Sequence, residues 1–509
     1  MRKSVSIIKL IVFCCIYLVS IKGKVQSKGR QFLANFMNNG NPGANFLFVS
    51  SEEFGNFTID SISMSPLTLP LSPMKSVSIR LPDNLESTPQ TNLDRVGILV
   101  TSTVDITIYA LNENTAGSSE DAYAVLPIAA LSTLYVVTGA GRNELITVAA
   151  VEDSTHVNIT LRTTCNVDWE RTTYYDGDTI SADLNSLDVL QLAHTSNSGT
   201  PCVFAGTQVS SDKPVSVLSG ASCTGTNCDH AVTQMLPTEL WGKRFIVPSF
   251  NDTGHIRIQM AASEDDTNIY VTEHYGDGTR HTTRRIIDAN RVMDIYVPNL
   301  TFTEIFSYKN ILVTGFSTGP APFSFPIASI ESFGWNYTIS TMDNVYASNF
   351  TSYVNILTKT DMLSTLTMDG YAPHPSHWSR ATDLGYSVAT IPITRGSHRF
   401  EASDPFMVLV YGYSAKGSYG YNAGYGFDNL PSGGLVVTAP TLAPTTMPVT
   451  TVSTVTATPN TCIDKPGVDC HLLDDSLHIC KDPKTAQDYC RKYCNICSPC
   501  PKPGGCIIG

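Results

Sequence analysis

The sequence predicts an all-β fold, and composition, alternating segments and an internal repeat each support that prediction. Of the 509 residues, 42% are hydrophobic and 15% are charged, which leaves enough apolar material for a large core. The 35 glycines, 29 prolines, 22 tyrosines and 20 phenylalanines favour strands and turns over helices. The formal net charge of −12 argues against a nucleic-acid or anionic-membrane partner, because both require a basic stripe.

Four segments of alternating polarity indicate a repeat. Residues 146–160 place two alternating runs around Glu152 and Asp153, a pattern that predicts a β-hairpin. Echoes of this segment lie at 256–271, 46–59 and 354–368, and the four starts are 100, 110 and 98 residues apart. We therefore expect four units of about 100 residues, each with roughly eight short strands.

Two architectures fit these units. Each unit is either one β-sandwich, giving four in tandem, or two four-stranded blades, giving a closed eight-bladed propeller-like ring. The ring is favoured because residues 29–36 resemble residues 242–248, and the fourth unit ends at Gly424 before it reaches such a strand. We expect residues 29–36 to complete the last blade and so remove the free edges.

The ends of the chain predict secretion. Residues 1–23 have a positive start and a short apolar run, as in a signal peptide, and we expect cleavage between Ser20 and Ser27. No later segment reaches the ~18 consecutive apolar residues of a membrane span. Six glycosylation sequons follow the leader: Asn56, Asn158, Asn251, Asn299, Asn336 and Asn349.

A linker divides the remaining chain. Residues 438–461 contain eleven Ser or Thr and four Pro among 24 residues, which predicts an extended stalk. It separates a β-repeat body, 24–437, from a small tail, 462–509. Eight of the twelve cysteines that follow the leader lie in this tail, which indicates disulfides in a secreted chain.

The four cysteines of the body allow two interpretations. Cys223 and Cys228 stand five residues apart around Gly225, which favours a small disulfide loop and leaves Cys165 to pair with Cys202. The alternative is a zinc site, because Asp229 and His230 follow Cys228 directly. The secreted context favours the disulfides.

No other constellation predicts a catalytic, cofactor or metal site. His374 and His377 flank Pro375, which prevents a helix that could align their imidazoles, so a loop is expected. The acidic turns at 152–153 and 264–266 either bind calcium or simply form turns, and turns are favoured. No hydrolase, P-loop or dinucleotide motif is present.

Several motifs of the body resemble a known family. They are Lys213-Pro-Val-Ser-Val-Leu-Ser-Gly-Ala-Ser-Cys223, Cys228-Asp-His, Gln234-Met-Leu-Pro and Trp241-Gly-Lys-Arg-Phe-Ile-Val-Pro248. Together with the opening Gly29-Arg-Gln-Phe, they resemble the N-terminal domain of the IgGFc-binding protein family over about residues 29–427. The resemblance implies an extracellular binding or matrix role, as in mucus, without catalysis.

The tail resembles the ShK-toxin-like (ShKT) domain. The spacing C-x7-C-x9-C-x9-C-x3-C-x2-C from residue 462 to 497 carries the resemblance. The connectivity that it implies is Cys462–Cys497, Cys470–Cys490 and Cys480–Cys494, and Cys500 and Cys506 in the remaining 498–509 segment are left to pair. Channel-blocking members carry a Lys-Tyr pair where this sequence has Lys484-Thr485, so a binding module is favoured over a blocker.

Three functions follow from these observations. The favoured one is a secreted, non-enzymatic glycoprotein that binds an extracellular glycoprotein, glycan or matrix partner through its body. The alternatives are a secreted hydrolase with an axial pocket and a channel-modulating toxin acting through the tail. A pocket with converging carboxylates would favour the hydrolase, whereas a flat, tyrosine-rich surface would favour binding.

Overall fold

The computed structural model describes most of the predicted body. The described residues are 25–40, 43–114, 119–193, 201–250, 255–275, 277–298, 302–342, 350–374, 378–381, 384–415 and 417–430, with Cys480 and Cys494. The predicted leader, the Thr/Pro-rich linker and the rest of the tail lie outside them. Among the described residues, no helix is long and apolar enough to cross a membrane.

The all-β prediction is confirmed. Strands dominate every part of the chain that the structure describes, and its helices are short 3-10 turns. These turns are η1 (Asp83–Leu85), η2 (Ile128–Ala130), η3 (Thr238–Leu240), η4 (Ile330–Ser332) and η5 (Thr360–Thr365). Runs rich in Val, Ile, Thr, Tyr and Phe form the strands because branched and aromatic side chains pack well on a pleated surface.

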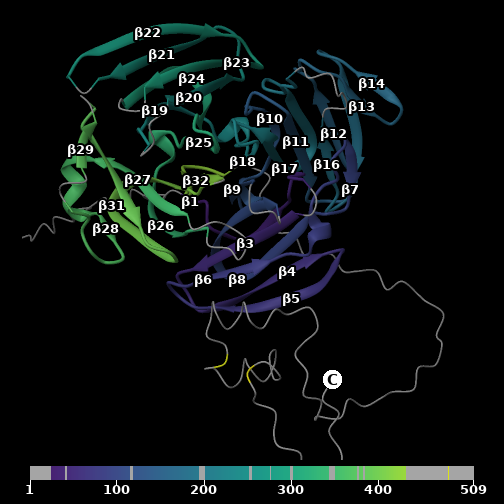
Figure 1. Ribbon diagram of the computed structural model, residues 1–509, viewed down its shortest axis with the longest axis horizontal. Helices are drawn as coiled ribbons and strands as arrows, with labels where there is room; N and C mark the ends of the chain where they lie inside the picture. The colour runs from purple at the N-terminus through teal and green to yellow at the C-terminus, as the bar shows by residue number, and fades with distance from the viewer. Residues whose placement is uncertain are drawn as a thin grey trace, which may run out of the picture.

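The first sheet has the strand order β5-β4-β8-β3-β6, with β2 and β9 also paired to β8 (Figure 1). Its strands are β2 (Gly29–Ala34), β3 (Gly43–Ser51), β4 (Gly55–Ser61), β5 (Met64–Leu71), β6 (Ser76–Arg80), β8 (Ile98–Asn114) and β9 (Glu120–Val125).

The second sheet has the order β15-β12-β17-β11-β16-β7, with β10 and β18 paired to β17. Its strands are β7 (Asn92–Asp94), β10 (Ser132–Val136), β11 (Glu144–Ala150), β12 (Thr155–Thr160), β15 (Thr179–Leu184), β16 (Val189–Leu192), β17 (Gln208–Thr224) and β18 (Asp229–Gln234). A two-stranded ribbon, β13 (Val167–Trp169) and β14 (Thr172–Tyr174), lies beside it.

The third sheet has the order β22-β21-β24-β20-β23, with β19 and β25 paired to β24. Its strands are β19 (Gly242–Val247), β20 (His255–Ala262), β21 (Thr267–His274), β22 (Arg280–Ile287), β23 (Arg291–Pro298), β24 (Phe302–Ser317) and β25 (Ser324–Pro326).

The fourth sheet has the order β26-β31-β27-β30-β29, with β28 and β32 paired to β31. Its strands are β26 (Gly334–Ser340), β27 (Thr351–Lys359), β28 (Thr367–Met368), β29 (Trp378–Ala381), β30 (Tyr386–Ile393), β31 (Ser397–Tyr413) and β32 (Ser418–Asn422).

Each sheet curls around one long strand, β8, β17, β24 or β31. The two halves of the long strand pair with different strands. In the second sheet, residues 208–211 of β17 pair with β12 and residues 215–221 pair with β11. In the third sheet, residues 302–307 of β24 pair with β21 and residues 311–317 pair with β20. Between the halves the register shifts, as between the Gly29 and Gln31 pairs on β8 and the Gly242 and Arg244 pairs on β24. Such bulges bend a strand and increase its twist, so each sheet folds back on itself.

The predicted hairpins are not formed. The two runs of 146–160 are strands β11 and β12, but β17 lies between them and pairs with both. The runs at 46–59 and 256–271 are separated by β8 and β24 in the same way. Alternation identifies which residues face the core, but it carries no information on which strand lies alongside.

The four sheets surround a common centre, where β9, β18, β25 and β32 meet (Figure 1). One continuous hydrophobic cluster includes Leu33 of the first sheet, Ile146 of the second, Ile258 of the third and Leu409 of the fourth. Neither an eight-bladed ring of four-stranded blades nor four tandem sandwiches is confirmed, because each group of strands forms one sheet of seven or eight strands.

The expectation that residues 29–36 complete the last blade is wrong. Strand β2 pairs with β8 of its own sheet, just as β19 pairs with β24, so the resemblance of these segments reflects equivalent positions at the start of each unit. The two ends of the body meet elsewhere: β1 (Val25–Gln26) pairs with β33 (Gly426–Phe427). Beside this ladder, the Ser27 N–H donates to the Tyr425 carbonyl at 2.7 Å.

Candidate functional site

Asp121 of β9 lies at the centre of the molecule and binds all three other sheets. Its side chain accepts hydrogen bonds from the backbone N–H groups of Val232 at 2.9 Å, Gly420 at 3.0 Å and Ser324 at 3.3 Å. These donors belong to β18, β32 and β25. Burial raises the pKa of Asp121, while the four backbone N–H donors to it act in the opposite direction.

Asp229 of β18 makes the reciprocal connection. Its carboxylate accepts hydrogen bonds from the backbone N–H groups of Glu120 at 2.8 Å and Ser418 at 3.0 Å. Burial also raises the pKa of Asp229, and the neighbouring charges of Glu120 and Asp121 add to the rise. Converging carboxylates are therefore present at the axis, but their oxygens join strands of different sheets, which is a structural role.

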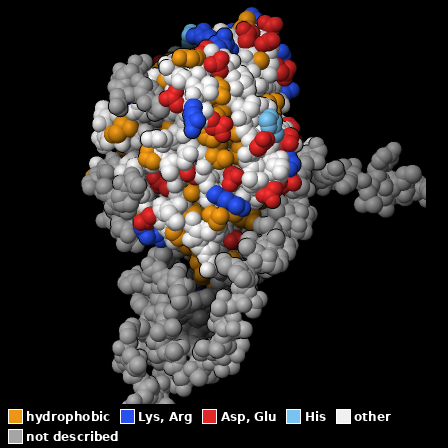
Figure 2. All heavy atoms as spheres, turned by 90° about the vertical axis from the view of Figure 1, so that its right-hand side faces the viewer, with side chains coloured by type: hydrophobic (Ala, Val, Ile, Leu, Met, Phe, Trp, Pro, Cys, Tyr) orange, Lys and Arg blue, Asp and Glu red, His pale blue; other side chains and the backbone are white. Residues whose placement is uncertain are grey.

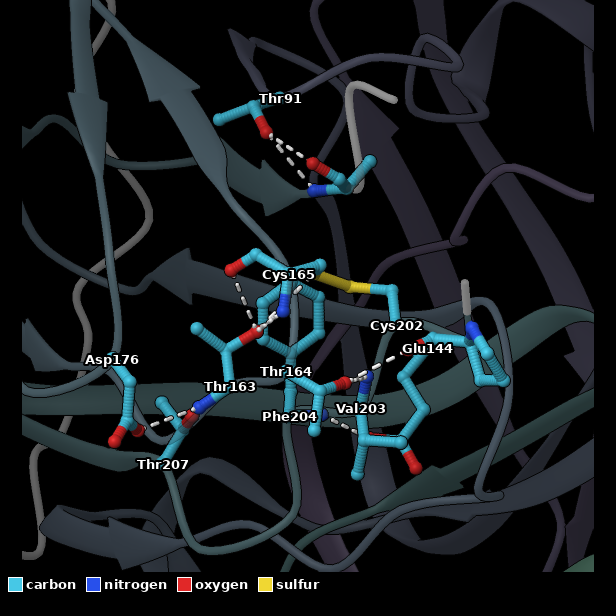
Figure 3. Close-up of a disulfide and its surroundings, with 12 residues drawn as sticks. Thr91, Glu144, Thr163, Thr164, Cys165, Asp176, Cys202, Val203, Phe204 and Thr207 are labelled. Atoms are coloured by element: carbon cyan, nitrogen blue, oxygen red, sulfur yellow. Dashed lines mark hydrogen bonds between the residues drawn. A yellow bond between two sulfur atoms is a disulfide. The ribbon is translucent and has the colours of Figure 1, made fainter. Parts of the chain in front are cut away.

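Two disulfides lie in the second sheet. Cys165 is joined to Cys202, which ties the segment after β12 to the segment before β17 (Figure 3). Beside this bond, buried Glu144 accepts hydrogen bonds from the backbone N–H groups of Phe204 and Ala205. Burial raises the pKa of Glu144 to about 6 against these bonds.

Cys223 is joined to Cys228 across the turn between β17 and β18. Because both sulfur atoms are in the disulfide, they do not offer the thiolates of the alternative zinc site. Asp229 is bound to the backbone as described above, and burial lowers the pKa of His230 to about 3. A third disulfide joins Cys480 to Cys494, and both cysteines pack against the core of the first sheet.

The acidic turns contact lysines of the long strands. Lys213 donates to the backbone carbonyl of Asp153, and Lys309 donates to that of Asp265, both at 2.5 Å. The Asp265 side chain accepts from the Ala289 N–H at 3.1 Å. Carboxylates and carbonyls that form these bonds stabilise the turns, which agrees with the turn interpretation.

The other predicted site residues are dispersed. Asn56, Asn158 and Asn336 lie in strands of the first, second and fourth sheets. His374 lies in an exposed segment. The remaining residues fall outside the described part of the chain: His377, Asn251, Asn299, Asn349, Lys484, Thr485, Cys462, Cys470, Cys490, Cys497, Cys500 and Cys506.

A row of two arginines and two aromatic rings crosses the third sheet. Tyr270 of β21 pairs with Arg284 of β22 on one side and with Phe306 of β24 on the other. Phe306 in turn pairs with Arg244 of β19. Directly paired residues point to the same face of a sheet, so these four side chains form a continuous line, here called the arginine–aromatic row.

The row faces away from the core. Its strand neighbours Ile269 and Ile305 are buried on the opposite face, whereas Arg244 and Arg284 are exposed. Tyr308, two residues after Phe306, is 68% exposed and lies on the same face. Large exposed aromatic side chains are unusual in a strand that has a packed face available to it, so this face is the candidate binding surface.

The rings form a shallow corner. The Tyr270 and Phe306 centroids are 6.2 Å apart with an interplanar angle of 30°, so these two rings are neighbours with a moderate tilt between their planes. Tyr308 stands at 76° to Phe306 with centroids 4.9 Å apart. The Arg244 guanidinium lies 5.6 Å from the Phe306 centroid, and the Arg284 Nε donates to Asn268 at 2.8 Å.

The other sheets carry different residues at the same ladder positions. The equivalent row is Thr68, Thr58, Thr101 and Gln31 in the first sheet, Ser181, Asn158, Ser210 and Leu134 in the second, and Thr367, Glu401 and Asn336 in the fourth. The side of the molecule formed by the second sheet accordingly shows scattered charges of both signs and small hydrophobic groups (Figure 2). The arginine–aromatic row is therefore not a requirement of the strand arrangement.

Sequence reasoning did not identify this row. The signal that could have found it is the alignment of the repeated segments: counting from Thr155 and Thr267, which begin β12 and β21, places Tyr270 where the second unit has Asn158. The substitution of a sequon asparagine by tyrosine marks the third unit as different.

Comparison with known proteins decides the family. The profile of the IgGFc binding protein family matches residues 121–412, more than half of the chain. The chain belongs to this family. Human IgGFc-binding protein is 23% identical over 425 residues, which cover 78% of this chain and 7% of the human protein. The chain thus spans a small fraction of its human relative.

One solved structure aligns with most of this chain but with low structural similarity. It is the tetra-tandem repeat in the extending region of a large adhesion protein. The match covers 78% of this chain and 98% of that chain at 12% identity. Its TM-score is 0.10, which is too low for an argument about fold or function.

Proposed function

We propose that this member of the IgGFc-binding family is a secreted, non-enzymatic glycoprotein that binds an extracellular glycoprotein, glycan or matrix partner through its β body. The observation that carries the proposal is the arginine–aromatic row of the third sheet. Tyrosine and arginine are enriched where binding energy concentrates, because they combine a large contact area with hydrogen-bonding groups. The name of the human relative adds the Fc region of immunoglobulin G as a partner to be tested.

The extracellular location is part of the proposal. The signal-like residues 1–23, the six sequons and the disulfides of the body all support it. The four sheets of similar strand order support four repeats around an axis for the body at 24–437. The linker at 438–461 and the ShKT-like module at 462–497, followed by 498–509, complete the proposed organisation.

The proposal is tested with the full-length secreted chain. The chain is immobilised and exposed to purified immunoglobulin G Fc and to an array of glycoprotein glycans, and saturable binding to at least one of them is expected. A Phe306→Thr variant should bind at least tenfold more weakly, because it removes the ring that contacts both Tyr270 and Tyr308. Absence of saturable binding to every probe, or full binding by the variant, contradicts the proposal.

A further inference from the structure

We propose that the arginine–aromatic row is a binding site for an anionic glycan, a saccharide that bears carboxylate or sulfate groups. The inference rests on the proposed binding function and assigns its ligand class. It follows from the size of the row, the orientation of its rings, the charges at its two ends and its place among the four sheets.

The row is small compared with a standard protein–protein interface. Neighbouring strands are about 4.8 Å apart, so four strands span about 14 Å, and Tyr308 extends the face by about 7 Å along the strand. The resulting footprint is roughly 100 Å². A standard protein–protein interface covers about 800 Å² on each partner, so the row instead has the dimensions of a few sugar rings.

The ring faces suit the apolar side of a sugar. Tyr270 and Phe306 lie on adjacent strands with their ring planes tilted by 30°, and Tyr308 stands at 76° to Phe306. The face of an aromatic ring carries partial negative charge, which attracts the polarised C–H groups of a pyranose. Asn268 and Thr272 lie on the same face of β21, where Asn268 accepts from Arg284 and the Thr272 hydroxyl bonds to that of Thr282, so they hold the neighbouring strand β22 in place beside the rings.

Arginines terminate the row at both ends. Arg284 and Arg244 carry planar guanidinium groups whose N–H donors match the oxygens of a carboxylate or sulfate. At Arg284 the Nε and one terminal nitrogen donate to Asn268, which leaves its remaining N–H groups for a ligand. The chain as a whole carries a net charge of −12, so attraction of an anion must be local to this face. An anionic ligand therefore fits the row better than a neutral one.

Two acidic side chains lie near the row. The Glu304 carboxylate lies 3.3 Å from the His274 ring nitrogen on the same face. Glu331 approaches the row from η4, where its carboxylate accepts hydrogen bonds from the backbone N–H groups of Lys243 and Arg244. On β22, Arg280 adds a further positive charge to this face.

The sequons distinguish the third sheet from the others. Asn158 and Asn336 occupy the row positions of the second and fourth sheets, and Asn56 lies two residues before Thr58 on the same face of the first. A sugar attached at these positions would cover the corresponding outer faces. The described strands of the third sheet contain no sequon, so none lies on the row itself; Asn251 and Asn299 of this unit fall outside the described residues.

The test exchanges the row for that of the first sheet. In the full-length chain, the substitutions Arg284→Thr, Tyr270→Thr, Phe306→Thr and Arg244→Gln reproduce Thr68, Thr58, Thr101 and Gln31, residues that this strand arrangement already accepts. The matched control replaces Thr58 and Thr101 by Ala. Calorimetric titration uses four probes: a heparin-derived hexasaccharide, its desulfated form, sialyllactose and its desialylated form, lactose.

We expect one or both anionic probes to bind, with at least tenfold weaker binding by the desulfated or desialylated counterpart. The exchanged variant should lose at least tenfold in affinity while the Thr58/Thr101 control binds as the native chain does. Raising NaCl from 0.05 to 0.5 M should weaken binding, because exposed charges are screened. If the fourfold exchange does not fold, Arg284→Gln alone decides, with a loss of at least threefold expected.

Several outcomes overturn the inference. They are binding by the exchanged variant at native affinity, equal binding of the desulfated probe, and binding of neither anionic probe. Preferential binding of a tyrosine-sulfated peptide through the row would replace the glycan by an acidic protein segment. Capture of immunoglobulin Fc without any glycan binding would end this inference but leave the proposed function standing, whereas absence of both would end the two together.

Discussion

The first and third sheets share a strand order and a register but differ on their outer faces. On the inner face, Phe57 and Ile269 occupy the same ladder position and both are buried. On the outer face, Thr58 corresponds to Tyr270 and Thr101 to Phe306. The comparison separates two demands on the sequence: packing determines the inner face, while the outer face is free to vary and can acquire a binding role.

The largest loss of stability is expected from a substitution at the centre that the four sheets share. Replacing Asp121 by Ala leaves the buried N–H groups of Val232, Ser324 and Gly420 without their acceptor. Each orphaned buried donor costs about 1–3 kcal/mol, so the free energy of unfolding should fall by about 3 kcal/mol or more. Chemical denaturation monitored by tryptophan fluorescence measures the change.

Asp60 of β4, which is partly exposed and lies far from the centre in its sheet, provides the control, since Asp60→Ala should change the midpoint of denaturation much less. Equal stability of the Asp121→Ala variant and the native chain would show that the axis does not hold the four sheets together.

Cavity-creating substitutions on the inner faces of the first and third sheets should destabilise the chain to a similar degree. Phe57→Ala in the first sheet and Ile269→Ala in the third each leave a cavity in a fully packed environment. We expect losses of about 3–5 and 2–5 kcal/mol respectively in the free energy of unfolding. A loss below about 1 kcal/mol in only one of the two variants would show that the sheets are not equivalent inside.

The first and third sheets should also differ in how pH affects the stability of the chain. Burial raises the pKa of Glu113 to about 9, the charge of Glu120 opposite adds to the rise, and Arg80 opposes it. The folded chain then keeps a proton that the unfolded chain releases above pH 4.5, so Glu113 makes stability fall between about pH 4.5 and 9. By register from Ile106 and Ile311, the third sheet has uncharged Thr318 at this position.

The Glu113→Gln variant should therefore have a higher melting temperature than the native chain at pH 8 and a similar one at pH 4.5. Calorimetric scans at both pH values check this expectation. Parallel curves for the two proteins, with no difference that grows as the pH rises, would contradict it.

The smallest effect is expected from the outer faces. The pair Tyr270→Thr and Phe306→Thr should change the free energy of unfolding by less than about 1 kcal/mol, because exposed positions contribute little and threonine is a good strand former. The same melting experiment measures it. A loss as large as that of Ile269→Ala would mean that the rings are structural.

Much of the fold could be predicted from the sequence, for reasons visible in particular strands. Alternation located β12 and β21 because every second residue there packs inward, whereas their partners in the pattern, β11 and β20, are buried on both faces over most of their length. The hairpin expectation was wrong because the long strand that separates the two runs comes about 50 residues later in the chain. The pairing of β2 was misassigned because similar segments reveal equivalence but not the boundary at which a unit begins.

The centre could not be predicted. Asp121 lies in β9, whose sequence Glu-Asp-Ala-Tyr-Ala-Val gives no sign that both of its carboxylates are fully buried. Its acceptors are satisfied by donors from positions 232, 324 and 420, and no local pattern connects such distant residues. The arginine–aromatic row could not be predicted for a related reason: its members come from four strands, and only the register between the strands aligns them.

The ladder between β1 and β33 has a consequence for how the chain can be connected. Because Val25 and Phe427 are direct partners, their backbones lie about 5 Å apart, and a few residues suffice to join them. A circular permutant that closes this gap and opens between the second and third sheets should reach the same arrangement. The arrangement of the four sheets would then not depend on which sheet is synthesised first.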